Sequence, residues 1–75
     1  MNMCDIEIGK KYAVVNVNCN KKTKERLEGI GLTKGSIITL VRKSPLMDPV
    51  EIKVNNFYLA IRIKDSKNIT VIENG

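Results

Sequence analysis

The stretch ERLEGIGLTKG, from Glu25 to Gly35, decides the fold because it indicates a short helix, a glycine stop and a turn. Leu27 and Ile30 are three residues apart and therefore share one helix face. Gly31 stands where a helix end commonly takes a positive φ, which glycine adopts without steric cost. A tight turn should follow, with Gly35 at its positive-φ position. We expect the helix to end at Gly31 and to lead into a strand.

This helix should depend on the rest of the chain for its stability. Asn18 or Asn20 can cap its start. Positive charge in the first turns opposes the helix dipole by about 0.3–1 kcal/mol per exposed site. Burial of Leu27, Ile30 and Leu32 must offset that cost. The basic residues near the helix start are Lys21, Lys22, Lys24 and Arg26.

Two strands should flank the helix. Alternation predicts the first strand over Lys11–Asn18, with one face made by Ala13, Val15 and Val17. The second strand is expected over Ser36–Lys43, where Ile38 and Leu40 face the core and Val41 begins a twist. Before the first strand, Met3 and Ile6 predict a short turn packed on the end of the sheet.

Three further strands complete the predicted sheet. Val50, Ile52 and Val54 alternate with charged residues, which is typical of a half-buried strand. Asn55 and Asn56 form a hairpin connection, because asparagine tolerates a positive φ better than most residues. The fourth strand is expected over 57–63, with Phe57, Leu59, Ile61 and Ile63 on its core face. The fifth is expected over 68–73, after a turn or one round of 3₁₀ helix at 64–67. The pattern predicts a mainly β, partly open five-stranded barrel with one short helix between the first two strands, a single domain over 1–75.

Composition narrows the classes of function. Thirteen Lys and Arg against eight Asp and Glu give a net charge of +5, which favours an acidic partner, nucleic acid or an anionic membrane surface. The chain has no His and no nucleophile–base pattern, so we expect neither an enzyme nor a cofactor. Met1, Met3 and Cys4 are soft ligands near a chain end, but we expect no metal there. Cys4 and Cys19 lack any metal or redox spacing and are expected as free thiols in a cytosolic protein without a signal peptide or membrane span.

Several short motifs in order resemble the FeoA family. They are Arg26-Leu27-x-x-Ile30-Gly31-Leu32-x-x-Gly35, Ser44-Pro45-Leu46-x-Asp48-Pro49, Leu59-x-Ile61-Arg62 and Ile69-x-Val71. The resemblance covers about Met3 to Val71 and implies a small SH3-like barrel. It departs from the family at Met47, where Gly is common, and at Lys34, where Pro is common. On this resemblance, Gly31, Gly35, Asp48, Pro49 and Arg62 are structural motif residues.

The resemblance implies a function in ferrous iron uptake. FeoA proteins accompany FeoB, a membrane iron transporter with a cytosolic G-protein domain, so the chain should act by binding that transporter's cytosolic portion. It would reach the membrane only through this partner, and self-association stays open. The alternatives are a small basic barrel that binds nucleic acid and a regulatory domain of the metal-dependent repressor type. Nucleic acid is not the expected partner, since the few aromatic residues offer little for stacking.

Two surface hypotheses follow, each beside a plainer interpretation. A partner groove could use Leu27, Ile30, Leu32 and Met47, although apolar helix positions usually pack in the core. A basic patch could include Lys21, Lys22, Lys24, Arg26, Arg42 and Lys43, although charge clusters are usually solvated surface. Arg62 should form an intramolecular ion pair with Asp48, Glu51 or Asp65.

Overall fold

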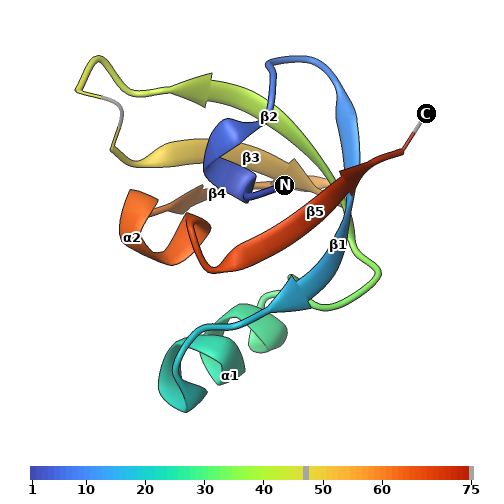
Figure 1. The fold of residues 1–75 in the computed structure, drawn as a ribbon, viewed down its shortest axis with the longest axis vertical. Helices are drawn as coiled ribbons and strands as arrows, with labels where there is room; N and C mark the ends of the chain where they lie inside the picture. Colours follow the sequence, from blue (N-terminus) through green and yellow to red (C-terminus); the bar gives the residue numbers. More distant parts are fainter. Residues whose placement is uncertain (47, 75) are drawn as a thin grey trace.

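The computed structural model describes residues 1–46 and 48–74, and its strands form one antiparallel sheet in the order β4-β3-β2-β1-β5 (Figure 1). The sheet curls around its core without closing, and β4 and β5 are its two edges. This confirms the predicted partly open five-stranded barrel with a helix between the first two strands. No helix in the described ranges is long and apolar enough to cross a membrane. The elements are η1 Met3–Asp5, β1 Lys11–Val17, α1 Lys21–Gly29, β2 Ile37–Lys43, β3 Val50–Val54, β4 Phe57–Ile61, α2 Ile63–Ser66 and β5 Ile69–Glu73.

Apolar side chains from all five strands meet in one cluster inside the curled sheet. The alternation in β3 is confirmed, because its first, third and fifth residues are fully buried. The inward positions of Ile38 and Leu40 are confirmed as well. Met3 and Ile6 are also buried at the end of the sheet, as the sequence predicts. Tyr12 joins this core, and its hydroxyl oxygen accepts a hydrogen bond from the Glu7 N–H at 3.0 Å.

The single face predicted for Ala13, Val15 and Val17 of β1 is wrong, because a bulge interrupts the strand. The pairing of β1 with β5 shifts register between Val14 and Asn16, so Val15 has no partner and is exposed. Tyr12 and Val14 therefore point inward before the bulge, and Val17 points inward after it. One inserted residue moves every later side chain to the other face. A similar shift occurs in β2 at Val41, between Leu40 and Arg42, where a twist was expected.

The fourth strand is shorter than predicted. The hairpin before it is confirmed, with Asn55 at a φ of 55°. However, Phe57 is 37% exposed rather than in the core, and the strand ends at Ile61. Ile63 instead begins α2, a single short helix over Ile63–Ser66, where the end of the strand and then a turn or one round of 3₁₀ helix were expected. The Asp48 carboxylate explains this change, because its Oδ1 accepts the Ile63 N–H at 2.9 Å and caps the start of the short helix.

Candidate partner-binding groove

A groove of about 300 Å³ lies between α1 and β4. The helix side contributes the side chains around its last turn, and the strand side contributes the second half of β4 and the residue after it. The groove has a mainly apolar lining with an arginine from each side. The lining residues are Arg26, Leu27, Ile30, Leu59, Ala60, Ile61 and Arg62.

The helix wall of the groove is fixed by caps at both ends of α1. At the start, the Asn20 side chain accepts the Thr23 N–H at 2.8 Å, which selects Asn20 over Asn18 as the cap. At the end, the Leu32 N–H donates to the Leu27 carbonyl at 2.9 Å. The next N–H inward, from Gly31, donates to the carbonyl of residue 28 at 3.0 Å, and Gly31 has a φ of 97°. These two hydrogen bonds form a Schellman cap, with Gly31 at the positive φ that the sequence predicts.

The structure separates the residues of the predicted groove. Leu27 is 2% exposed and Leu32 is fully buried, so both pack mainly in the core. Ile30 is 38% exposed and lies in the groove with the edge of Leu27. Met47 lies outside the described residues. Leu59 and Ala60 also line the groove but were not predicted, because no pattern in the sequence indicates which strand lies beside the helix.

The end of α1 packs against the β3–β4 hairpin. A Cβ atom built on Gly31 would lie 3.4 Å from Cζ of Phe57 and 3.5 Å from Nδ2 of Asn55. Phe57 therefore covers the helix end, which explains why it is not available to the core. Gly31 meets two demands at once, a positive φ and close contact with the hairpin.

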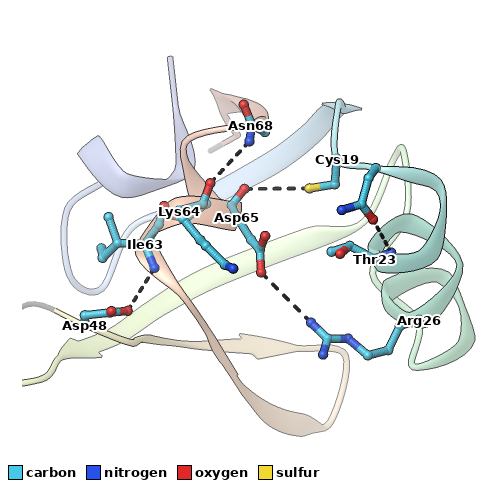
Figure 2. Close-up of polar contacts among 10 residues, drawn as sticks. Cys19, Thr23, Arg26, Asp48, Ile63, Lys64, Asp65 and Asn68 are labelled. Atoms are coloured by element: carbon cyan, nitrogen blue, oxygen red, sulfur yellow. Dashed lines mark hydrogen bonds and ion pairs between the residues drawn. The ribbon is translucent and has the colours of Figure 1, made fainter.

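Polar contacts join α1 to α2 beside the groove (Figure 2). Arg26 reaches from α1 toward Asp65 of α2, with 4.0 Å between Nη2 and Oδ2. The Cys19 thiol lies 3.8 Å from the Asp65 carbonyl oxygen, and burial together with the Asp65 charge raises the pKa of this thiol. A second hollow shares Arg26 and Arg62 with the groove and adds Lys64 near Asp65. The groove is thus continuous with a cationic rim.

The predicted ion pair of Arg62 is wrong. Asp48 accepts the backbone N–H of residue 63, Asp65 pairs with Arg26, and Glu51 lies 3.7 Å from Arg42. Within residues 1–46 and 48–74, Arg62 has no carboxylate at ion-pair distance. Its guanidinium is exposed at the groove instead.

The residues of the predicted basic patch come from two separate places. Those on α1 lie at the bottom of the molecule in Figure 1, whereas the end of β2 lies near the top. Arg42 pairs with Glu51, and the Lys43 ammonium donates to the Cys4 carbonyl at 3.3 Å. Of the six predicted residues, Arg26 lines the groove. The α1 group is Lys21, Lys22, Lys24 and Arg26, and the β2 group is Arg42 and Lys43.

Potential metal ligands are dispersed over the described part of the chain. No three His, Cys, Asp or Glu side chains gather there at metal-binding distance. Cys4 and Cys19 are free thiols, as expected. Met3 is fully buried in the core, so its thioether does not face a shared site with Met1 and Cys4.

Comparison with known proteins relates this chain and its fold to a known family. Residues 1–73 match the FeoA domain family. A curated relative from Porphyromonas gingivalis, an Fe(2+) transport protein A/Fe(2+) transporter FeoB fusion protein, is 27% identical over 71 residues. That match covers 95% of this chain and 8% of the relative, so the chain spans a small part of the relative's length.

Solved structures match over nearly the whole chain. The FeoA protein from Chlorobium tepidum is 28% identical with a TM-score of 0.95, covering 100% of this chain and 71% of that one. The zinc complex of Stenotrophomonas maltophilia FeoA, described as a prokaryotic SH3 domain protein, is 25% identical with a TM-score of 0.81, covering 96% and 89%. These matches confirm the SH3-like barrel. A manganese-dependent transcriptional repressor, 10% identical with a TM-score of 0.86 over 99% of this chain and 36% of that one, shares the fold alone.

Proposed function

The chain belongs to the FeoA domain family, which is associated with ferrous iron transport, and on this premise we propose that it is a non-catalytic accessory protein that binds a FeoB-type transporter. The observation that carries the proposal is the fusion relative, in which a region similar to this chain and a FeoB transporter share one polypeptide. A tether of this kind keeps two binding partners at high effective concentration. Without such a tether, association requires a contact surface.

The α1–β4 groove is the surface that best fits such a contact. It combines the half-exposed Ile30 with Leu59 and Ala60 of β4, while Arg26 and Arg62 border it. A central apolar anchor with a polar rim is the usual composition of a protein interface. We propose that the transporter's cytosolic portion docks here, and that docking supports its assembly or the regulation of its G-protein domain at the inner face of the membrane.

The test is the affinity of this chain for the purified FeoB-type transporter of the same genome, measured in detergent by isothermal titration calorimetry. Ile30→Gln removes an apolar contact that should contribute about 1–2 kcal/mol to the free energy of binding. It should therefore weaken binding about tenfold. Ile72→Gln is the matched control, because Ile72 is 57% exposed on β5 and does not line the groove. Leu27→Gln is less suitable, since Leu27 supports the core.

Two results would contradict the proposal. Absence of binding by the unmodified chain would exclude the transporter as its partner under these conditions. Equal affinities of Ile30→Gln and Ile72→Gln would exclude the groove as the contact surface while leaving the transporter as the partner.

A further inference from the structure

The edge of β4 that faces away from β3 is open. The hairpin closes at the pair Val54 and Phe57, so Phe57 directs its backbone N–H and C=O toward β3. The direction alternates along a strand, and the N–H and C=O of Tyr58 and Ala60 therefore point outward. In the described part of the chain, these outward groups have no backbone partner.

The opposite edge of the sheet is covered. The Val71 N–H of β5 donates to the Met1 carbonyl at 2.8 Å, and the Met1 amino group donates to the Val71 carbonyl at 3.2 Å. Asn2 and Thr70 form a further bridge. The first residues of the chain thus cover β5 as a short extra strand, whereas the open edge of β4 borders the groove. Open edges favour pairing with an added strand.

Positive charge predominates beside the open edge. The groove and the hollow next to it are lined by three cations, Arg26, Arg62 and Lys64, and by one carboxylate, Asp65. Asp65 is already paired with Arg26 at 4.0 Å, and Arg62 is exposed without an ion pair in the described ranges. An acidic ligand complements this rim.

We propose that an extended, acidic segment of the transporter partner occupies the groove and pairs with β4 as a sixth strand, an inference that rests on the proposed function. The segment's backbone exchanges hydrogen bonds with Ala60 and Tyr58, as in strand addition to a sheet edge. Its alternate apolar side chains contact Ile30 and Leu59, and its carboxylate lies near Arg62. A bound helix satisfies its own backbone and would leave the edge N–H and C=O groups of β4 buried and unpaired, which is unfavourable.

Amide hydrogen exchange measured by NMR tests the pairing directly. The ¹⁵N-labelled chain is saturated with the unlabelled transporter in nanodiscs, and exchange is compared with that of the free chain. Strand addition should slow exchange at the Tyr58 and Ala60 amides at least tenfold, because each donor gains a hydrogen bond. The amide of Ile72, on the far edge strand, should keep its exchange rate.

Two variants test the backbone and the charge separately. Ala60→Pro removes an outward N–H without touching the β3 ladder, and it should weaken binding about tenfold or more. Arg62→Gln should weaken binding up to about fivefold, and the affinity of this variant should depend less on salt. The charge-matched control Lys67→Gln should leave both the affinity and its salt dependence unchanged. Unchanged exchange of the Ile52 amide in β3 verifies that each variant is folded.

Each outcome decides a different claim. Binding with unchanged exchange at Tyr58 and Ala60, or normal binding by Ala60→Pro, would overturn strand addition and leave the proposed function intact. Equal effects of Arg62→Gln and Lys67→Gln would overturn the acidic character of the segment. No binding by the unmodified chain would overturn the proposed function and this inference together.

Discussion

Replacing Gly31 by alanine tests whether the cap of α1 depends on the positive φ at this position. The φ of 97° at this position costs an L-residue about 1–2 kcal/mol. The new Cβ would stand 3.4 Å from Phe57, which is ordinary van der Waals contact, so backbone strain rather than a clash dominates. Alanine also lowers the conformational entropy of the unfolded chain, which stabilises the folded state by about 0.4–1 kcal/mol. We therefore expect Gly31→Ala to lower the free energy of unfolding by about 1 kcal/mol net.

Gly29 provides the matched substitution two residues earlier. It is the last residue of α1, its φ is not positive, and a Cβ there would meet no atom within 4 Å. Gly29→Ala should raise the free energy of unfolding by about 0.5–1 kcal/mol. Urea unfolding followed by far-UV circular dichroism measures both changes, and about 1 kcal/mol corresponds to 4–8 °C in midpoint temperature. Equal effects of the two variants, or the reverse order, would refute the argument from φ.

Three further predictions concern the groove and its supports. Leu27→Ala should lower the free energy of unfolding by about 2–5 kcal/mol because Leu27 is buried, whereas Ile30→Gln should change it by less than about 0.5 kcal/mol. Chemical denaturation measures both changes. Similar losses would contradict the placement of Leu27 in the core and of Ile30 at the surface. Asp48→Ala should lower the free energy of unfolding by about 0.5–2 kcal/mol, because it removes the acceptor of the Ile63 N–H. Asp48→Asn keeps an acceptor oxygen and should retain most of that free energy in the same assay. The raised pKa of Cys19 means that the folded state holds the thiol proton more tightly than the unfolded state, so the free energy of unfolding should fall as pH rises above the ordinary thiol value of 9.0. Cys19→Ser should remove part of that fall, as measured by urea titrations across pH. An unchanged pH profile in this variant would contradict the prediction.

The fold was predictable where local patterns act alone. Three predicted features depend only on residues a few positions apart in the sequence: the alternation of β3, the hairpin at Asn55 and the glycine cap at Gly31. The bulge at Val15 was not predictable, because a two-residue period gives no sign of an inserted residue whose place is set by the neighbouring strands. Phe57 fits either face of a strand by sequence, and its packing on the helix end decided its position.

The groove was predicted only in part. Ile30 follows from helix periodicity and the cap, so its place on the helix wall could be foreseen. Leu59 and Ala60 could not be foreseen as the second wall, because the sequence does not say which strand forms the edge of the sheet. The predicted ion pair of Arg62 failed for a related reason: the nearby carboxylates had other partners, which depend on tertiary contacts.

The most direct test of the central claim is an NMR titration that maps where the transporter contacts this chain. The ¹⁵N-labelled chain is titrated with the FeoB-type transporter in nanodiscs, and losses of amide signal intensity are followed residue by residue. If the groove is the contact surface, the earliest losses fall on Ile30, Leu59 and Ala60. Earliest losses on the outer sheet face, around Ile37 and Ile72, with the groove signals retained, would contradict it.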